Sequence, residues 1–515
     1  MLGQALHIKN GQALPVASVP ALSAAAFRAA VMQAVRDGGR IASLFGYPSK
    51  KGGDGVRLIV VIVRGQGLEL LSTEVGDSYP ALTPDCPEAH LFEREVAEQW
   101  GVVPEGHPWL KPVRFHPSYR PGRDAWPRDG KARGWGQIEP SVTDYFAMSG
   151  EDVHEVAVGP VHAGVIEPGH FRFQCHGETV FHLEISLGYQ HRGIERQLAG
   201  GPHLRTLYQM ETAAGDTTAA HTWAYSMAME ALSGVQAPPR AAVLRGVAVE
   251  LERLANHIID LGMIAGDVGF LPTLNYCGRL RGDALNTTTA ICGSRMGRGW
   301  VRPGGVRFDI DEKLRDQALR TLDGWLKDAA AAVNLLWDTP SVIARLEGTG
   351  QVSSETARSL GLVGVAARAS GLRRDARFEF PAAPYDGFEP DMGETGDVFA
   401  RAWVRWQEVK KSCALLQQWL DDLPQGPISA APEGANPARL KLAPDSIAVA
   451  LVEGWRGEVC HTAITGPDGR FARYKIVDPS FHNWQGLAVA LRDQAISDFP
   501  LCNKSFNLSY CGHDL

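Results

Sequence analysis

Charged residues of the types that can move protons gather in one short part of this sequence. A basic and acidic turn, His191-Arg-Gly-Ile-Glu195, ends a strand-like run, and Asp216 and His221 follow at the start of a helical stretch. A buried carboxyl group with a raised pKa can pass protons toward a reaction cavity. We therefore predict that Arg192, Glu195, Asp216 and His221 belong to a catalytic site.

Two of these residues have an ordinary structural explanation that stays open. Glu195 could form an ion pair with Arg192 or Arg196 that only fixes the turn. Asp216 stands before two threonines and could be the N-cap of the next helix, which is the explanation we favour for it.

The chain of 515 residues, 44% hydrophobic and 21% charged, is long enough for two or three domains with apolar cores. The net charge of −7 and the scattered basic residues exclude a nucleic-acid partner. No run approaches the roughly 18 apolar residues that a membrane span needs. The N-terminus lacks the pattern of a signal peptide, so we expect a cytoplasmic location. The eight cysteines form no C-x-x-C pair and are expected to be small buried hydrophobes.

The apolar pattern predicts the α+β class, with a small α/β domain first. Residues 1–115 contain helical spacing from Leu22 to Asp37, a hairpin starting at Arg57, and an amphipathic helix after Ala89 that is closed by Gly101. Each side of the following linker has apolar strands and helices of its own, so we expect the first domain to fold by itself.

The linker spans 116–150, where Pro, Gly and Arg are frequent without periodicity, and 151–515 form the second domain. Small β elements are expected around His170 and again from Ile447 to Val477. The rest of this domain is predicted to be mainly helical, with long helices at Gly215–Leu232, Arg240–Leu261, Leu280–Met296, Glu312–Trp337 and Val398–Leu423.

Several short strings in a fixed order carry a resemblance to a known family. The turn H-R-G-x-E is followed by a helix ending Ala224-Tyr-x-x-Ala-x-Glu-x-Leu232. Further strings follow in the family's order: Glu250-Leu-Glu-Arg-Leu-Ala-Asn-His257, Gly293-Ser-Arg-Met296, Arg302-Pro-Gly-Gly-Val306, Glu453-Gly-Trp-Arg-Gly-Glu458 and Asp478-Pro-Ser-Phe481. The second domain thereby resembles the quinone-site subunit of respiratory complex I and the large subunit of membrane-bound, formate-hydrogenlyase-type nickel-iron hydrogenases.

The first domain resembles a second complex I subunit. Glu93-Arg-Glu95, Trp100-Gly-Val102 and Gly106-His-Pro-Trp-Leu110 occur in the order found in the small hydrophilic subunit that sits beside the quinone-site subunit. Some lineages fuse the two on one chain, and this sequence is similar to such a fusion.

The resemblance implies that this chain holds no metal. In the hydrogenase branch two C-x-x-C pairs hold nickel and iron, because soft thiolates suit these metals. The four aligned positions here are Ala214, Thr217, Ser509 and Gly512, and Cys511 is one place off. No nickel-iron centre is therefore predicted.

A quinone is the cofactor that the complex I branch implies. That branch binds the quinone headgroup between a histidine in a loop after Gly-Pro and a tyrosine in the first helical segment. Here the loop after Gly159-Pro160 is longer, so His162 and His170 are both candidates for binding the cofactor. The tyrosine position aligns with Gly215, and Tyr208 lies upstream of it.

Arg456 joins the predicted site because of the resemblance. The Gly-Trp-Arg-Gly string places it in a rigid turn facing the cavity of the missing metal, although a surface cation on a hairpin is the alternative. The family scaffold brings the H-R-G-x-E turn, the next helix start and the C-terminal segment together. We therefore expect Arg192, Glu195, Asp216, His221 and Arg456 to converge on one partly buried space.

The resemblance implies a hydrophilic-arm subunit of a membrane-associated, complex-I-like or hydrogenase-like oxidoreductase complex of the NADH:quinone oxidoreductase type. Its partners would be an iron-sulfur small subunit, which carries the iron-sulfur cluster, and membrane-arm subunits. Such a chain is expected to be cytoplasmic and peripheral on the inner membrane. The alternative is a structural or coupling subunit without catalysis, which keeps the scaffold only to dock its partners.

Overall fold

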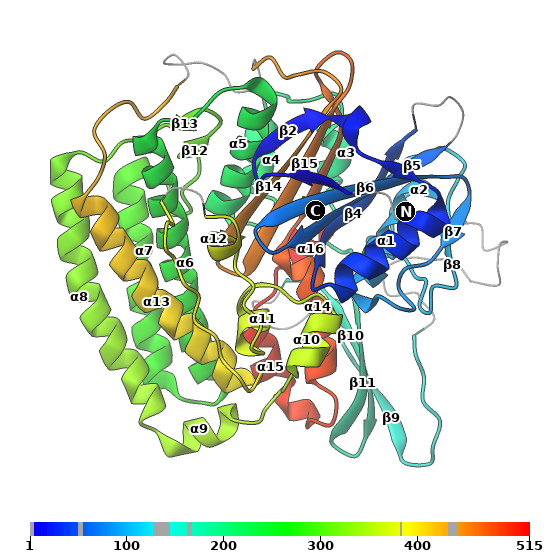
Figure 1. Cartoon of the computed structure of the whole chain (residues 1–515). Helices are drawn as coiled ribbons and strands as arrows, with labels where there is room; N and C mark the ends of the chain where they lie inside the picture. The colour runs from blue at the N-terminus through cyan, green and yellow to red at the C-terminus, as the bar shows by residue number, and fades with distance from the viewer. Residues whose placement is uncertain (1–4, 50–54, 127–144, 162–166, 382–383, 431–439) are drawn as a thin grey trace.

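The computed structural model describes residues 5–49, 55–126, 145–161, 167–381, 384–430 and 440–515. Long helices form one side of the molecule, a sheet of N-terminal strands forms the other, and strands from the C-terminal part lie between them (Figure 1). The predicted α+β class is confirmed.

The N-terminal sheet is built around three neighbouring antiparallel strands. These are β4 (Arg40–Pro48), β5 (Val56–Arg64) and β6 (Gly67–Val75), and the predicted hairpin is β5 and β6. Helix α1 (Ala24–Arg36) lies against this sheet, and α2 (His90–Trp100) packs on β4 and ends at Gly101, whose φ is 64°. Two short strands, β1 (Leu6–Ile8) and β3 (Ala21–Leu22), pair with β6.

A second sheet belongs to both ends of the chain. Strands β14 (Ser446–Gly454), β15 (Gly457–Thr465) and β16 (Phe471–Val477) form the predicted C-terminal β element, and β2 (Gln12–Pro15) pairs with β14. Buried residues of β14 and α14 share one apolar cluster with those of β4 and β5. The first domain therefore does not close its core on itself, as separate folding would require.

Buried ion pairs join the same two parts of the chain. Arg40 donates to both carboxylate oxygens of Glu458 at 2.7 and 2.5 Å, and both side chains are almost fully buried. Lys475 of β16 lies 2.7 Å from Glu95 of α2. The domain boundaries at 115 and 150 remain predictions, because part of the linker lies outside the described residues.

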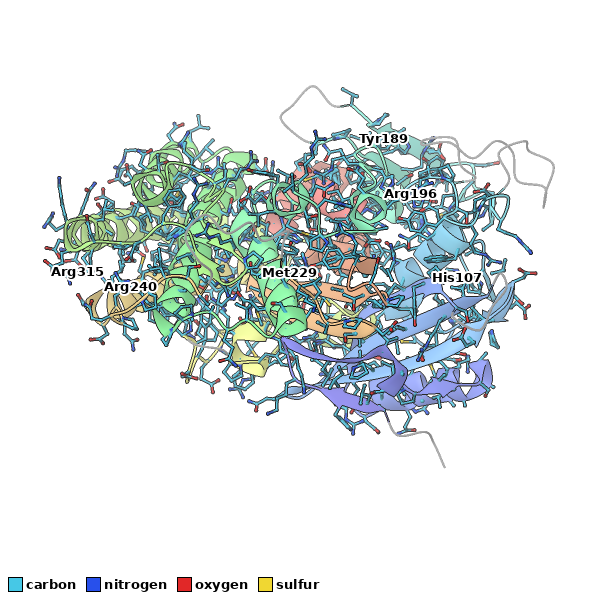
Figure 2. All side chains as sticks on the ribbon, turned by 90° about the horizontal axis from the view of Figure 1, so that it is seen from above. His107, Tyr189, Arg196, Met229, Arg240 and Arg315 are labelled. Carbon is cyan, nitrogen blue, oxygen red and sulfur yellow. The ribbon has the colours of Figure 1, made fainter. Side chains whose placement is uncertain are left out.

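The helical side contains the five long helices that the apolar pattern predicts. Their bounds are α5 (Thr218–Ser233), α6 (Pro239–Asp267), α7 (Leu271–Cys292), α8 (Glu312–Trp337) and α13 (Val398–Asp421). Helix α6 packs on α7, and α13 packs on α6. Seen from above, Arg240 and Arg315 mark this side, whereas His107 marks the side of the N-terminal sheet (Figure 2).

Shorter elements complete the fold. Strands β9 (Val153–Val158), β10 (His170–His176) and β11 (Thr179–Ser186) form a separate antiparallel sheet. The remaining short elements are β7 (Ser78–Pro80), β8 (Val103–Glu105), β12 (Val301–Arg302), β13 (Gly305–Val306), α3 (Ile194–Leu198), α4 (Thr206–Glu211), α9 (Pro340–Leu346), α10 (Ser354–Ser359), α11 (Gly364–Ala369), α12 (Ala376–Glu379), α14 (Pro479–Ala490), α15 (Phe499–Phe506) and α16 (Tyr510–Asp514). None of the helices in the described residues is long and apolar enough to cross a membrane.

Candidate functional site

Asp216 and Arg456 form a two-pronged ion pair at the centre of the predicted site. The Arg456 guanidinium donates from Nη1 to Asp216 Oδ1 at 2.6 Å and from Nη2 to Oδ2 at 2.8 Å. Its Nε donates to the carbonyl of Asn507 at 2.5 Å, and its plane lies 3.8 Å from the centre of the Trp455 ring. Arg456 is 5% exposed and Asp216 34%, so the pair has one buried member and one that reaches water.

The hairpin turn between β14 and β15 positions Arg456. Gly457 has a φ of 139°, which favours glycine, and Gly364 approaches the turn so closely that a Cβ there would meet the Arg456 carbonyl at 2.0 Å. The indole N–H of Trp455 donates to the Asp216 carbonyl at 2.9 Å. Arg456 is therefore held in a rigid turn and is not a surface cation.

The N-cap explanation for Asp216 is wrong. Thr217 is the N-cap of α5, and no side chain bonds to the first N–H groups of that helix from the cap position. The Asp216 carboxylate instead accepts from Arg456 and from the Thr217 hydroxyl at 3.3 Å. A charged partner in the turn between β14 and β15 outcompetes the local cap.

His221 belongs to a buried chain of four side chains. Its Nε2 lies 3.0 Å from Asp478 Oδ2, its Nδ1 lies 3.0 Å from His461 Nε2, and His461 Nδ1 lies 2.9 Å from the Tyr474 hydroxyl. Because an ionised carboxylate only accepts, His221 must donate from Nε2, and one consistent direction then runs from Tyr474 to Asp478.

The charges along this chain follow from its burial. Burial and the neighbouring His221 hold the pKa of His461 well below its usual value. Burial alone would raise the pKa of Asp478, but the hydrogen bond and charge of His221 and the charge of Arg456 hold it below its usual value. Asp478 is therefore ionised, His461 is neutral, and Asp478 links His221 electrostatically to the Asp216–Arg456 pair.

Arg192 ties the H-R-G-x-E turn to the C-terminal segment. Its guanidinium donates to the carbonyls of Thr212 at 2.6 Å, Ala213 at 2.8 Å and Cys511 at 3.1 Å. The backbone N–H groups of Arg192 and Gly193 both donate to the Leu515 carbonyl at 3.0 Å. Arg192 thus reaches the segments on both sides of the pair, and its hydrogen bonds in the described part of the chain go to these segments and not to Asp216 or Arg456.

Glu195 lies in a different charge cluster from the Asp216–Arg456 pair. Its Oε2 accepts from Arg473 Nη2 at 2.8 Å and its Oε1 accepts from Lys475 Nζ at 2.9 Å, and the side chain is buried. The expected alternative of an ion pair with Arg192 or Arg196 is wrong, since the partners come from β16. In Figure 2 the next residue, Arg196, lies on the same side of the molecule as the N-terminal sheet.

The surroundings of Glu195 keep it ionised. Burial would raise the pKa of its carboxyl, but Lys475, Arg473 and Arg114 hold the pKa well below the usual value. Lys475 also pairs with Glu95, so the cluster spans the junction of the N-terminal sheet and β16. A proton-relay role for Glu195 depends on a raised pKa, and the pKa of this carboxyl group is lowered instead.

Of the two histidine candidates for cofactor binding, His170 lies within the described residues. His162 lies outside the described residues. His170 is buried at the start of β10, where its Nδ1 lies 3.3 Å from the Gly159 carbonyl and its Nε2 accepts from Arg172 at 3.2 Å. Burial lowers its pKa. Both ring nitrogens are therefore engaged by neighbours of the same sheet.

The donor set beside the pair does not fit a nickel-iron centre. Thr217 and Ser509 offer hydroxyls, and Ala214 and Gly512 offer no ligand side chain. A Cβ at Gly512 would lie 2.6 Å from Asp478 Cγ, so a cysteine could not stand there unless Asp478 moved. Cys511 lies 3.4 Å from the Ser509 hydroxyl, and burial raises the pKa of its thiol. Within the described ranges no three His, Cys, Asp or Glu side chains are grouped as metal ligands would be.

A small recess with a cavity volume of about 20 Å³ lies on the α6 and α7 side of Asp216. Its polar lining comes from Asp216, Glu252, Asn256, Thr288 and Arg295. The recess therefore has room for about one water molecule beside the pair.

Sequence reasoning missed several residues of this site. Asp478 stood in a family string without a role, and Tyr474, His461 and Glu252 were not singled out. The alternation of the strand Phe471–Val477 could have indicated that Arg473 and Lys475 point to one face as a pair of cations.

Comparisons with known proteins cover both parts of the chain. The family described as "Respiratory-chain NADH dehydrogenase, 49 Kd subunit" matches residues 267–514, and "Respiratory-chain NADH dehydrogenase, 30 Kd subunit" matches residues 26–132. The carbon monoxide-induced hydrogenase of Rhodospirillum rubrum is 35% identical over 357 residues, which are 69% of this chain and 97% of that protein. Formate hydrogenlyase subunit 5 of Escherichia coli is 29% identical over 502 residues, which are 92% of this chain and 84% of that protein.

A solved structure shares the fold. A chain of the membrane-bound sulfane sulfur reductase, an archaeal respiratory membrane complex, superposes with a TM-score of 0.66 at 24% identity, covering 71% of this chain and 99% of that one. Fold and matches together define a class, the subunits shared by respiratory complex I and complex-I-like hydrogenases. This chain belongs to the family of the 49 kDa subunit of respiratory-chain NADH dehydrogenase and its related hydrogenases, with a region of the 30 kDa subunit family fused before it.

Proposed function

We propose that this chain is the hydrophilic-arm subunit of a membrane-associated oxidoreductase complex and shapes a reaction cavity that works without nickel and iron. The observation that carries the proposal is the Asp216–Arg456 pair. It stands where the metal-binding segments of the hydrogenase relatives would meet, and the recess opens beside it.

The pair and its neighbours provide fixed charge for a reaction that moves protons and electrons. A carboxylate and a guanidinium that are pre-positioned beside a partly enclosed space can stabilise charge that develops on a bound acceptor. Asp478 accepts from His221 and from the Ser480 N–H, and it thereby fixes the start of α14. Arg192 holds α16 through the carbonyl of Cys511.

A quinone or a similar acceptor is the substrate class that the relationship to NADH dehydrogenase favours. His170 stands at the start of β10, whose preceding residue Gly169 lies against Tyr510 of the C-terminal segment. An iron-sulfur cluster would be held by a partner subunit, and membrane-arm subunits would provide the membrane link, with the chain on the cytoplasmic side. The names of the relatives, a hydrogenase and a formate hydrogenlyase subunit, support the proposal of an oxidoreductase complex with several subunits.

One observation favours the alternative of a coupling subunit without catalysis. Every nitrogen of the Arg456 guanidinium already has a protein acceptor, from Asp216 and Asn507, so the guanidinium has little left to offer a ligand. In that case the pair serves to hold the scaffold together while the chain docks its partners.

The two candidates are separated by testing the assembled complex. The complex is purified from its host through a tag on this chain, as wild type and with Asp216→Asn or Arg456→Met. Partner subunits are identified by mass spectrometry, iron and nickel are measured by elemental analysis, and turnover is measured as reduction of a soluble quinone. Asp328→Asn, which removes an exposed ion pair with Arg279 on the helical side, is the matched control.

If the cavity is catalytic, both site variants lower turnover at least tenfold while the complex assembles with its full iron content. Wild-type turnover in assembled Asp216→Asn and Arg456→Met complexes would reject the catalytic cavity in favour of the coupling subunit. One nickel per chain in the wild type would contradict the proposal of a nickel-free site.

A further inference from the structure

Glu252 of α6 is a carboxyl group of the recess lining that forms no ion pair with a cation among the described residues. It lies in the middle of α6 facing the start of α5, where its Oε2 accepts from the Ala219 N–H at 2.7 Å. Its other oxygen, Oε1, is buried and has no hydrogen-bond partner in the part of the chain that the structure describes. An ionised carboxylate left half-bonded in a buried place is costly, whereas a protonated one carries an O–H that can donate.

The charged groups around Glu252 favour the same conclusion. Asp216 faces it from the loop before α5 and carries a like charge, which opposes ionisation of Glu252. Arg253 is the next residue on α6, but its guanidinium is bonded to Glu250, Glu408 and the carbonyls of the β14–β15 turn. Helix α7 contributes only Leu285 and Thr288, and Arg295 at the mouth of the recess is exposed.

We propose that Glu252 is a neutral carboxylic acid in the folded protein and that it stores a proton for the recess beside Asp216. Oε1 is buried in this structure, so an acceptor that enters the recess would reach the Oε1–H group only after the Glu252 side chain turns toward it. When the acceptor takes the proton, the O–H bond breaks, the carboxylate keeps the electron pair, and water at the mouth of the recess supplies the next proton.

The stored proton is coupled to the Asp216–Arg456 pair through charge. While Arg456 neutralises Asp216, Glu252 faces little net negative charge. If the pair opens, the free Asp216 carboxylate opposes ionisation of Glu252 more strongly, so Glu252 holds its proton more tightly. The use of this proton rests on the proposed function, but its presence on Glu252 does not.

The affinity for the proton follows from burial. Burial, helped by the charge of Asp216, raises the pKa of Glu252 to about 8, although the N–H groups of Ala219 and Ala220 and the charge of Arg253 oppose the rise. The folded state therefore binds one more proton than the unfolded state between about pH 4.5 and 8. The stability that Glu252 contributes is present at low pH and declines as the pH rises through that window.

The test is a titration of the full-length chain by infrared difference spectroscopy. Burial raises the pKa of Glu88 and of Glu453 to about 7 as well, so the band of Glu252 is read from the difference between wild type and Glu252→Gln. This difference should show the carbonyl stretch of a protonated carboxyl group at pH 7. Glu389→Gln is the control, because Glu389 is an exposed glutamate that pairs with Arg373. This variant should leave the band unchanged. A difference spectrum between wild type and Glu252→Gln that lacks the band at pH 6 would overturn the proposal.

Two further variants test the coupling, each first shown to be folded by circular dichroism. Asp216→Asn should shift the midpoint of the Glu252 band to lower pH, and Arg456→Met should shift it to higher pH. Shifts in the same direction, or no shift in either, would overturn the coupling. Because turnover is not measured, a failure of the proposed function would leave this titration result standing.

Discussion

Arg456 and Asp216, which are 240 positions apart in the chain, face each other with both carboxylate oxygens engaged. The contact joins the turn between β14 and β15 to the loop before α5, and the carbonyl of Asn507 completes the surroundings of the guanidinium. Three distant segments therefore meet at one buried cation.

The first prediction concerns the strength of this contact. Asp216→Asn and Arg456→Met each leave one charge without its partner, which should cost about 1–3 kcal/mol of unfolding free energy, toward the lower end because Asp216 is partly exposed. The double variant should recover at least about 0.5 kcal/mol of the summed loss. Urea unfolding of the four proteins measures this coupling.

The exposed pair of Arg279 and Asp328 supplies the control cycle, with coupling of less than about 0.5 kcal/mol. Equal coupling in both cycles would mean that the Asp216–Arg456 contact is no stronger than an ordinary surface ion pair.

The second prediction is that Glu195 stabilises the junction between the N-terminal sheet and β16. Glu195→Gln leaves Arg473 without its carboxylate and Lys475 with only Glu95, and breaking a buried pair in this way costs about 3–5 kcal/mol. Thermal or urea unfolding should show the loss, while Glu389→Gln at the surface should change little.

The pH dependence of the same variant gives a sign that can be checked. The folded-state pKa of Glu195 is depressed, so its contribution is present above the unfolded pKa near 4.5 and is lost as the pH falls toward the folded value. The difference between wild type and Glu195→Gln should therefore shrink below about pH 4. A difference that grows on acidification would show that Glu195 is not held ionised.

The sequence predicts the helical side of the fold well, because long amphipathic helices repeat a clear pattern. The helix Glu312–Trp337 begins and ends as predicted, with Asp311 capping its first turn. Strand β4 was missed, since nearly all of Arg40–Pro48 is buried on both faces and no alternation marks it.

The site was predictable only where one segment or the family order specified it. The resemblance placed Arg456 near the helix start that carries Asp216, but it could not place Glu195, whose partners depend on the register of β16. The register of β16 is set by its pairing with β15. That pairing contains a bulge between Ile464 and Thr465, which no local sequence pattern predicts.

The third prediction concerns the chain from Tyr474 to Asp478. Tyr474→Phe removes the donor to His461 Nδ1 and leaves a buried acceptor unsatisfied, at a cost of about 1–3 kcal/mol. Tyr208→Phe, on an exposed tyrosine of α4, is the control and should change little. Unfolding by urea measures both.

The protonation state of this chain is accessible to nitrogen NMR of labelled histidine. His461 should stay neutral, with its proton on Nε2, well below pH 6.5, because burial and His221 lower its pKa. A histidine buried neutral contributes stability that is present above the unfolded pKa and lost as the pH falls below it. An imidazolium signal for His461 at pH 6 would contradict the direction of donation assigned here.

The last prediction addresses how the two parts of the chain hold together. A protease site inserted into the linker between Arg123 and Tyr145 should be cut, and the two fragments should still elute together from a size-exclusion column. The reason is structural: β2 is an edge strand of the C-terminal sheet, and Arg40 is bonded to Glu458 across the junction. Glu458→Gln should weaken the association of the cut fragments, because Arg40 then keeps only Glu379 as an anionic partner, whereas Glu155→Gln on the separate β9–β11 sheet should not. A fragment of residues 1–115 that dissociates after cleavage and unfolds cooperatively by itself would show that the apolar cluster shared with β14 and α14 is dispensable, and the first domain would then be an independent folding unit.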